Sequence, residues 1–381
     1  MKQGWEYKKL GEVCNITMGQ SPDGKSINDN EGVEFHQGKT CFGERTLGVS
    51  CLFSNAPVKL AEANSVLLCV RAPVGYPNIT NRKICIGRGL CALYAKENID
   101  NTFLFYSLLG KQSHFEKNAT GSTFKAISSK VISNTEIPFP PKSTQLSIVS
   151  ELDKINELIR LKKEQLKDYD NLAQSIFYEM FGDPVENEKG WEVKKLGEVC
   201  ITIKDGDHMP PPKSESGIPF LTISDINKET RELDFSNTYF VPIEYYNNLK
   251  EERKAKLNDL LYTVTGSYGI PVIVKDERQF CFQRHIALIR PQKEVLSTYF
   301  LCYWVLSAAV KSIADKVATG IAQKTVGLNS IRKFEIIIPP LPLQHLFAQR
   351  IEQIERQRSA VQKSITDLET LLASRMQYWF E

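Results

Sequence analysis

Apolar residues recur between Thr144 and Phe181 at alternating steps of three and four, and the stretch contains neither Pro nor Gly. Such spacing over about four heptads is typical of a coiled-coil helix, and Gly182 and Pro184 indicate where it ends. At 1.5 Å per residue the predicted helix is about 55–60 Å long. Its stripe consists of Leu152, Ile155, Ile159, Leu166, Tyr169, Ala173, Ile176 and Met180, with Lys162 at the one charged position.

The same pattern returns near the C-terminus. A helix with so narrow an apolar stripe needs a partner to cover it, and this chain carries two such helices. We therefore predict an antiparallel intramolecular pair. The second stripe consists of Ile351, Ile354, Arg358, Val361, Ile365, Leu368, Leu372, Arg375 and Trp379.

Other segments also occur twice. GWEYKKLGEVC at 4–14 matches GWEVKKLGEVC at 190–200, and a third pair sets Arg88 against Arg284. Each copy then runs through EIPFPP or EIIIPP into a long helix, so the chain is two copies of one plan. The remaining matches are 64–77 with 258–271, 83–93 with 279–289, and ATGSTFKAI (119–127) with ATGIAQKTV (318–326). Between them, 15–63 and 201–257 share little, which indicates one task performed on two different targets.

The rest of each copy mixes short β-rich runs, bounded by Gly and Pro, with short helices expected near 101–114 and 297–316. The sequence thus predicts an α+β fold, with two mixed α/β globular domains separated by an antiparallel coiled coil of two long helices, as an internal pseudo-twofold repeat. Such a dumbbell would hold two surfaces at a fixed separation. The predicted boundaries are globular domains at 1–142 and 183–341, and long helices at 143–182 and 342–381.

Composition narrows the class of protein. The 381 residues are 42% hydrophobic with a net charge of +3, a balance that permits nucleic-acid binding without requiring it. Nine cysteines without a C-x-x-C pair suggest neither a zinc ribbon nor a disulfide framework, so we expect buried, reduced thiols. The absence of an apolar signal region and of a run of about 18 apolar residues predicts a soluble, cytoplasmic protein with no membrane segment.

No catalytic signature is present. The chain lacks the Asn/Asp-Pro-Pro-aromatic tetrapeptide of amino-methyltransferases and the G-x-x-x-x-G-K-[ST] phosphate loop. Gly87-Arg88-Gly89 is a lone G-x-G, and Pro22-Asp23 with Gln37-Gly38-Lys39 is only a faint likeness to a nuclease core. The five histidines lack metal-ligand spacing. We therefore expect neither an enzyme nor a cofactor.

Basic and amide residues on loops bounded by Gly and Pro remain as candidate DNA contacts, because these side chains clamp phosphates and hydrogen-bond base edges. Arg88 and Arg284 recur at the same place in both copies, although a structural ion pair is an alternative. Each Thr-Gly block with its Lys could offer backbone amides to a phosphate or could pack the domain onto its helix. The candidates are Lys39, Arg45, Arg71, Arg82, Lys83, Arg88 and Lys125 in the first copy, and Lys204, His208, Lys213, Arg278, Gln283, Arg284 and Lys324 in the second.

Three motifs together resemble the specificity subunit of type I restriction-modification systems. They are W-x-x-K-K-L-G-E-V (Trp5 and Trp191), T-G-x-x-x-K, and P-P-L-x-x-Q (Pro339-Pro340-Leu341, Gln344). The resemblance implies two target-recognition domains that each bind one half of a split sequence in double-stranded DNA. It also implies helices that act as a spacer and dock two modification (methyltransferase) subunits and, through them, restriction subunits. Methylation, ATP use and cleavage would reside in those partners.

The first copy has Phe124 where this family often has a Gln before the Lys, so the two T-G blocks need not make the same contact. Divergent variable regions predict an asymmetric target with an unspecified gap. Two alternatives stay open: the specificity partner of another restriction class, and a scaffold whose loops grip proteins rather than nucleic acid. Clustering of the basic candidates on one face of each domain would count against the scaffold.

Overall fold

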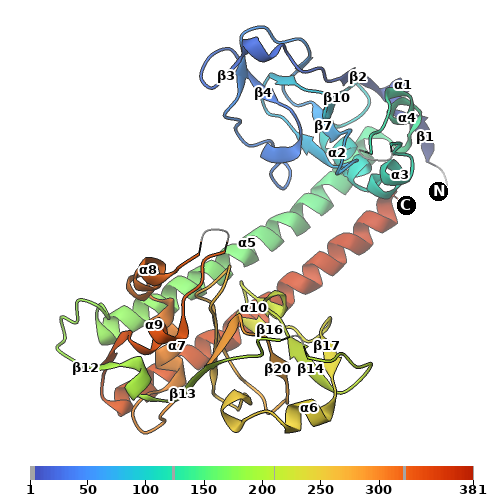
Figure 1. The fold of residues 1–381 in the computed structure, drawn as a ribbon. Helices are drawn as coiled ribbons and strands as arrows, with labels where there is room; N and C mark the ends of the chain where they lie inside the picture. Colours follow the sequence, from blue (N-terminus) through green and yellow to red (C-terminus); the bar gives the residue numbers. More distant parts are fainter. Residues whose placement is uncertain (1–4, 122–124, 210, 321–322, 381) are drawn as a thin grey trace. The chain divides into compact units, whose positions relative to one another are not determined.

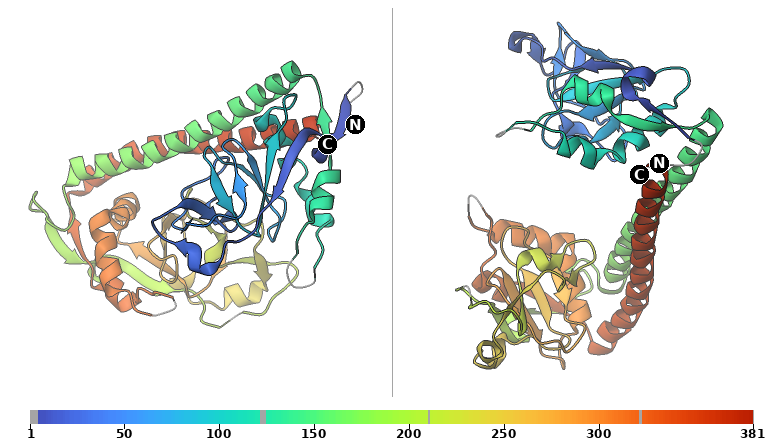
Figure 2. Two further views of the ribbon diagram at one scale, coloured as in Figure 1. Left: turned by 90° about the horizontal axis from the view of Figure 1, so that it is seen from above. Right: turned by 90° about the vertical axis from the view of Figure 1, so that its right-hand side faces the viewer.

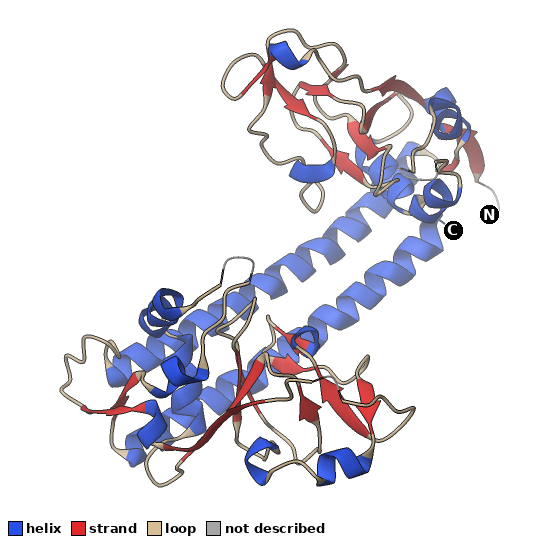
Figure 3. Ribbon diagram, viewed as in Figure 1, coloured by secondary structure: helices blue, strands red, loops and turns tan. Residues whose placement is uncertain are grey.

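The computed structural model describes residues 5–121, 125–209, 211–320 and 323–380, and the statements below concern these residues. The chain divides into two compact units, and Figure 1 labels many of their helices and strands. Unit 1 comprises Met1–Lys163 and Lys363–Glu381, and unit 2 comprises Glu164–Gln362. Both mix helices and strands (Figure 3), which confirms the predicted α+β class.

Two long helices, α5 (Lys142–Phe181) and α10 (Leu341–Phe380), contribute a segment to each unit and contain 40 residues each. Every position of the two predicted stripes is buried or half-buried. Leucines outside the stripes, such as Leu158 and Leu172, are exposed. The three-four spacing therefore identified which face of each helix is covered.

Contacts between α5 and α10 give their direction within each unit. In unit 1 the first part of α5 lies beside the last part of α10 (Figure 2). Lys163 Nζ of α5 is 3.3 Å from Glu369 Oε1 of α10. In unit 2 the last part of α5 meets the first part of α10, where the ring centroids of Phe177 and Phe347 are 5.7 Å apart. The paired segments thus run in opposite directions in both units.

Unit 1 contains three sheets. A four-stranded antiparallel sheet has the order β2-β10-β7-β8, a five-stranded sheet has the order β3-β5-β4-β9-β6, and β1 pairs with β11. Its strands are β1 (Glu6–Lys9), β2 (Cys14–Met18), β3 (Ile27–Asn28), β4 (Val33–His36), β5 (Phe53–Ser54), β6 (Leu60–Ala61), β7 (Val66–Cys69), β8 (Pro77–Ile79), β9 (Ile84–Ile86), β10 (Leu90–Ala95) and β11 (Glu136–Phe139). Its short helices are α1 (Leu10–Val13), α2 (Asn101–Leu109), α3 (Gln112–Lys117) and α4 (Ser129–Asn134).

Unit 2 repeats two of these sheets, as β13-β21-β18-β19 and β12-β22, and differs in the others, β17-β14-β20 and the hairpin β15-β16. Its strands are β12 (Glu192–Lys195), β13 (Cys200–Asp205), β14 (Ile218–Leu221), β15 (Ile226–Asn227), β16 (Glu232–Leu233), β17 (Tyr239–Val241), β18 (Leu260–Thr263), β19 (Pro271–Ile273), β20 (Cys281–Phe282), β21 (Ile286–Pro291) and β22 (Glu335–Ile338). Its short helices are α6 (Ile243–Asn247), α7 (Thr298–Leu306), α8 (Ala308–Val317) and α9 (Leu328–Arg332). Most strands of the common sheets come from the matched sequence blocks, but β2 and β13 extend into the variable segments, and β9 and β20 connect the matched blocks to the sheets that differ.

The repeated Lys-Lys-Leu-Gly-Glu motif makes the turn that follows β1 and β12. Its leucines, Leu10 and Leu196, are fully buried. Glu12 accepts a hydrogen bond from the Lys9 N–H at 3.3 Å, and Glu198 accepts one from the Lys195 N–H at 3.2 Å. The motif is therefore explained by packing and capping.

The Gln of each Pro-Pro-x-x-x-Gln segment fixes the start of a long helix. Gln145 is fully buried, and its Oε1 accepts from Asp100 N at 2.9 Å. Its Nε2 donates to the carbonyl oxygens of Asn98 and Pro140. Gln344 makes the same three bonds in unit 2, to Ser297 N, Val295 O and Pro339 O.

Each core includes the ends of the long helices. In unit 1 the Trp5 ring stacks on Trp379 at a centroid distance of 5.9 Å. In unit 2 Phe181 packs edge-on against Phe300 at 4.8 Å and Phe347 at 5.3 Å. The helices are therefore part of each unit's hydrophobic core.

Two short helices that the sequence predicted as single are each divided. The one expected at 101–114 is broken at Gly110 into α2 and α3, and the one expected at 297–316 is broken at Ser307 into α7 and α8. Ser307 Oγ accepts from Val310 N and caps α8. An N-cap residue has a non-helical backbone and therefore ends the helix before it. The spacing of apolar residues did not reveal this interruption.

The nine cysteines are free, and seven are buried as expected. Cys41 is half-buried and Cys51 is exposed, so these two thiols differ from the prediction that all would be buried. Both lie in the variable segment 15–63. Among the described residues, none of the helices combines the length and the apolar character that crossing a bilayer requires.

Candidate nucleic-acid interface

Arg88 and Arg284 occupy equivalent tight turns, between β9 and β10 and between β20 and β21. The same backbone bond closes each turn, from Leu90 N to Gly87 O and from Ile286 N to Gln283 O, both 3.0 Å. Both arginines are exposed, and within the described part of the chain neither guanidinium has an ion-pair partner. The structure therefore leaves both guanidiniums open to solvent.

The segment that follows the first strand of each four-stranded sheet packs directly on this turn. Gly19 N donates to Leu90 O at 2.9 Å, and Gly206 N donates to Ile286 O at 3.2 Å. A Cβ on Gly19 would lie 2.1 Å from the Gly87 carbonyl oxygen, and one on Gly206 would lie 1.9 Å from that of Phe282. Only glycine permits so close an approach of two backbones.

The described parts of the Thr-Gly blocks form matching backbone pairs. Thr120 and Ala126 exchange two hydrogen bonds of 2.9 Å, and Thr319 and Thr325 exchange bonds of 2.9 and 2.7 Å. The loop tips, which contain Phe124 in the first copy, lie outside the described residues.

Each block also pairs with the segment that follows β7 or β18 of the four-stranded sheet. Ala72 N donates to Lys125 O at 3.2 Å, and Gly266 N donates to Lys324 O at 2.9 Å. The described flanks of the blocks therefore pack against the end of β7 or β18. Of the two roles left open for these blocks, packing onto the long helix finds no support in these contacts.

In unit 1 these contacts gather four predicted residues at one edge. Val70 N donates to Gly89 O, which brings the loop that carries Arg71 beside the Arg88 turn. Lys39 lies against the same loop, with Nζ 4.7 Å from the centroid of Tyr76. We call the four exposed residues Lys39, Arg71, Arg88 and Lys125 basic edge 1.

In unit 2 the corresponding contacts surround a pocket of about 370 Å³. Its lining includes His208 and Arg284, together with Gln323 and Thr325, which flank Lys324 in the chain. We call His208, Arg284 and Lys324 basic edge 2. Gln283 adjoins it, and its N–H donates to Leu221 O at 3.0 Å.

Exposed and half-buried polar side chains line the basic edge 2 pocket beside Arg284. His208 Nε2 lies 2.7 Å from Asp205 Oδ2. Burial lowers the pKa of His285, and the positive charge of Arg284 lowers it further. A neutral imidazole both donates and accepts hydrogen bonds, so His285 adds hydrogen-bonding capacity while Arg284 and Lys324 supply positive charge.

Arg82 and Lys83 are engaged within unit 1. Arg82 Nε and Nη2 each donate to a carboxylate oxygen of Glu34 at 2.6 Å, and its Nη1 and Nη2 also donate to the carbonyl oxygens of Leu47 and Gly48. Burial opposes ionisation of Glu34, but bonds from Arg82, the Ser50 N–H and His36 outweigh it and lower the pKa of Glu34 to about 2. Lys83 Nζ is 2.8 Å from Glu62.

The remaining candidates also contact their own unit rather than joining a basic edge. Arg45 binds Asp153 on α5 at 2.7 Å. Lys204 forms an ion pair with Glu252 at 3.1 Å. Lys213 lies 4.7 Å from the ring centroid of Tyr239, and Arg278 lies 4.4 Å from the ring centroid of Phe235.

Sequence reasoning did not single out Lys228, and it named Gln37 only within the faint likeness to a nuclease core and not as a DNA contact. Lys228 Nζ donates to Ser267 Oγ at 2.8 Å, on the loop beside Thr265 of the pocket. Gln37 accepts from Ser21 Oγ at 3.0 Å and borders the Arg88 turn through its carbonyl oxygen. Lys228 comes from a segment without a counterpart in the first copy, so no repeat signal marked it.

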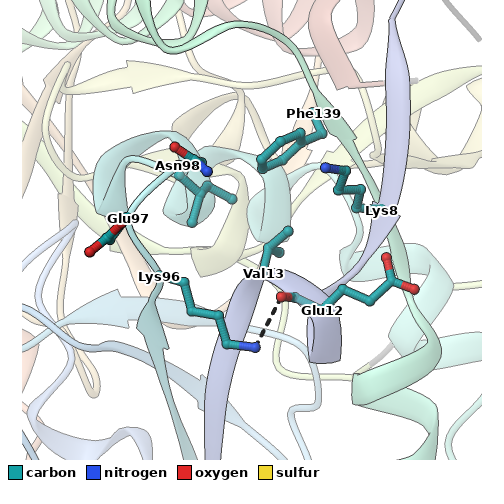
Figure 4. A pocket seen from close by; sticks show the side chains of 8 residues that line it. Lys8, Glu12, Val13, Lys96, Glu97, Asn98 and Phe139 are labelled. Carbon is teal, nitrogen blue, oxygen red and sulfur yellow. Dashed lines mark hydrogen bonds between the residues drawn. The ribbon is translucent and has the colours of Figure 1, made fainter.

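Another hollow in unit 1, of about 450 Å³, lies at the opposite end of β10 from Arg88 (Figure 4). It is lined by Lys8, Glu12, Lys96 and Phe139 among others, and Lys96 Nζ donates to Glu12 O at 3.0 Å. None of the predicted DNA contacts lines it. Within the described residues, no group of three or more His, Cys, Asp or Glu side chains is arranged to hold a metal ion.

The family of the chain follows from its match to a family model. The model of the type I restriction modification DNA specificity domain matches twice, over residues 2–168 and 188–370. The chain belongs to this family. Members are non-catalytic specificity subunits, and catalysis resides in other subunits of the system.

Individual specificity subunits show how far the similarity extends. The putative type I restriction enzyme MjaX specificity subunit of Methanocaldococcus jannaschii is 38% identical over 178 residues, which cover 46% of this chain and 42% of that protein. The type I restriction enzyme MjaIX specificity subunit of the same organism is 24% identical over 405 residues, covering 96% and 90%.

Solved structures share the fold. The S subunit of a type I restriction-modification system from M. genitalium has a TM-score of 0.56 at 15% identity, covering 99% of this chain and 96% of that one. A chain from a structure described as the basis of complex assembly and conformational transition of the type I R-M system has a TM-score of 0.61 at 19% identity, covering 100% and 98%.

Proposed function

We propose that this chain is the specificity subunit of a type I restriction-modification complex and that each unit binds one half of an asymmetric, two-part DNA sequence. The observation that carries the proposal is the pair of matched basic edges. Both are built from the same turn, the same glycine approach and the same Thr-Gly pairing and share an Arg and a Lys, yet the other side chains differ, Lys39 and Arg71 in one edge and His208 in the other. Two domains with the same framework and different side chains are suited to bind two different DNA half-sites.

The residue types fit double-stranded DNA. Lysine and arginine on exposed loops neutralise phosphates, and Arg, Gln and His also hydrogen-bond base edges in the major groove. Basic edge 2 offers Arg284 with Gln283, and basic edge 1 offers Arg71 with Arg88. The predicted contacts outside the edges, such as Arg82 and Lys213, remain predictions, and their internal partners favour a role in shaping the loops. Clustering on an edge in each unit weighs against the protein scaffold.

The long helices would act as the spacer. We propose that residues 143–182 and 342–381 form an antiparallel coiled coil that relates recognition domains at 1–142 and 183–341 by a pseudo-twofold axis. Support comes from the opposite direction of α5 and α10 within each unit and from their covered stripes. Exposed leucines such as Leu158 and Leu172 would dock two modification subunits, which in turn bind restriction subunits.

The test is methylome sequencing of a host that expresses this chain with its modification subunit, compared with a host that lacks the chain. A new asymmetric motif with a fixed unspecified gap is expected. A symmetric motif would contradict different half-sites, and the absence of any motif from an assembled complex would favour the scaffold.

Exchange of one variable segment assigns the half-sites. Replacing residues 15–117 by the equivalent segment of another specificity subunit should change one half of the motif and leave the other half and the gap intact. Replacement of 201–316, the corresponding part of the second copy, is the matched control and should change the other half. A change in both halves after one exchange would contradict independent reading.

A further inference from the structure

Arginines from the variable segments contact the long helices in both units. Arg45 lies in the variable segment of unit 1, and Arg231 ends the turn of the β15–β16 hairpin in unit 2. Neither lines a basic edge. Sequence reasoning proposed Arg45 as a DNA contact and did not single out Arg231.

In unit 1, Arg45 joins the variable segment to α5 and α2. Its Nη1 donates to Asp153 Oδ1 at 2.7 Å, and its Nη2 donates to Thr102 Oγ1 at 2.9 Å. Tyr106 donates to the same Asp153 oxygen at 2.7 Å, and the Arg45 guanidinium lies 5.9 Å from the Tyr106 ring centroid. Both donating nitrogens of the guanidinium are therefore directed at the framework.

In unit 2, Arg231 makes an equivalent junction with α5, α10 and α7. Its Nη2 lies 2.8 Å from Asp170 Oδ1 and 3.5 Å from Glu355 Oε1. The guanidinium is 6.0 Å from the Tyr303 ring centroid, and Tyr303 donates to the same Glu355 oxygen at 3.1 Å. An Arg of the variable segment, a carboxylate of a long helix and a Tyr of α2 or α7 thus meet in both units.

Two features of Arg231 indicate that its position is enforced. Its side chain is only 16% exposed, and its backbone adopts the left-handed conformation at φ 56°. A residue with a β-carbon adopts that conformation at a cost in free energy, so surrounding contacts must hold it there. Arg358 of α10 supplies a further contact, since its Nη2 donates to the Glu229 carbonyl in the same hairpin turn at 2.9 Å.

We infer that Arg45 and Arg231 are positioning residues that fasten each variable recognition segment to the long helices and so fix the orientation of each reader relative to the spacer. The inference rests on the proposed function. DNA sequence readout stays with the basic edges, while the arginines determine which gap between half-sites the protein accepts.

The first experiment measures methylation by the assembled complex on a DNA library in which the gap is varied by one base pair in either direction. The Arg45→Met and Arg231→Met variants should retain both half-sites and gain several-fold in relative methylation of sites with the altered gap. Asp153→Asn should show the same gain in methylation at altered gaps as Arg45→Met. The variant that carries both Arg45→Met and Asp153→Asn should show no further gain, because both substitutions break the same ion pair. Arg356→Met is the control, because it removes an exposed arginine from a long helix without touching either junction.

The outcomes separate the alternatives. A changed base preference in one half-site would overturn the inference for Arg45 by making it a DNA contact. A uniform loss of methylation at every gap would also overturn it, since that result describes reduced stability alone. A wild-type complex that modifies no motif would contradict the proposed function instead.

A second experiment does not depend on DNA. Hydrogen exchange of the full chain with the Arg231→Met substitution should show faster exchange at the backbone amides of 226–233 and unchanged exchange in β18 and β21. Unchanged exchange in the hairpin would overturn the fastening role whatever the DNA activity.

Discussion

Lys324 shows how one side chain can be assigned a role from its neighbours. Its carbonyl is bonded by Gly266 N, and the residues on either side of it line the pocket of basic edge 2. The backbone is therefore held while the exposed ammonium is free to meet a phosphate.

We expect Lys324→Met to weaken DNA binding by a similar factor for all sequences, because a phosphate contact carries no base information. The slope of log Kobs against log salt concentration should become less steep by about 0.9, the contribution of one phosphate contact. Filter binding or anisotropy over a salt series measures this. Lys194→Met, on β12 and paired with Glu192, is the control and should leave the slope unchanged. A shifted base preference would instead make Lys324 a base contact.

Glu34 predicts a pH dependence for unit 1. Because the pKa of Glu34 is lowered to about 2, the carboxylate stabilises the folded state at pH values above its usual pKa near 4.5. That stability should be lost as pH falls from about 4.5 towards 2, and the shift corresponds to roughly 3 kcal/mol. Urea unfolding of wild type and of Glu34→Gln across this range measures it. The variant should be less stable at pH 7 and less sensitive to acid, and equal acid sensitivity of the two proteins would contradict the prediction.

At the scale of elements, the helix starts depend on two buried amides. Gln145 and Gln344 are fully buried, and each satisfies one N–H and two carbonyl groups, of which the proline carbonyl is in a buried bond. The motif therefore joins a long helix to the loop before α2 or α7.

Gln344→Ala should lower the free energy of unfolding by about 3 kcal/mol, because buried polar groups lose their partners. Chemical denaturation of the full chain, followed by circular dichroism, measures the loss. Gln353→Ala, at an exposed position of the same helix, should cost little. Equal stability of the two variants would mean that the Gln344 site relaxes or hydrates.

The turns of the basic edges illustrate the same dependence on element packing. Gly19 accommodates a backbone approach that any side chain would prevent, whereas Gly24 has open space around its missing Cβ. Gly19→Ala should therefore displace the Arg88 turn and impair reading of one half-site in methylome data. Gly24→Ala is the control and should leave both half-sites intact, and retained reading by Gly19→Ala would contradict a fixed turn.

At the scale of the whole molecule, the proposed spacer role of the long helices predicts that helix length sets the accepted gap between half-sites. Insertion of seven residues after Lys163 and after Gln362 preserves the heptad stripe and lengthens each helix by about 10 Å. At 3.4 Å per base pair this corresponds to about 3 base pairs, so the accepted gap should grow by that amount while both half-sites persist. Methylome sequencing gives the result, and a changed half-site would contradict the separation of reading from spacing.

The sequence alone determined the α+β class, the extent of the long helices and the doubled plan. Helical periodicity and repeated blocks are local signals, and burial of the predicted stripes from Leu152 to Trp379 follows them. The domain boundaries and the coiled coil remain proposals, although the same patterns suggested them.

Tertiary structure decided which basic residues gather and which do not. Arg45 and Arg82 looked alike in sequence to Arg71 and Arg88, because the acids that engage them are remote along the chain: Asp153 is 108 residues from Arg45, and Glu34 is 48 residues from Arg82. Lys228 and Arg231 gave no signal, since the variable segments share no pattern. An ion pair between distant residues leaves no local trace, whereas helical burial repeats every few residues, and this difference separates what the sequence determined from what only the fold could decide.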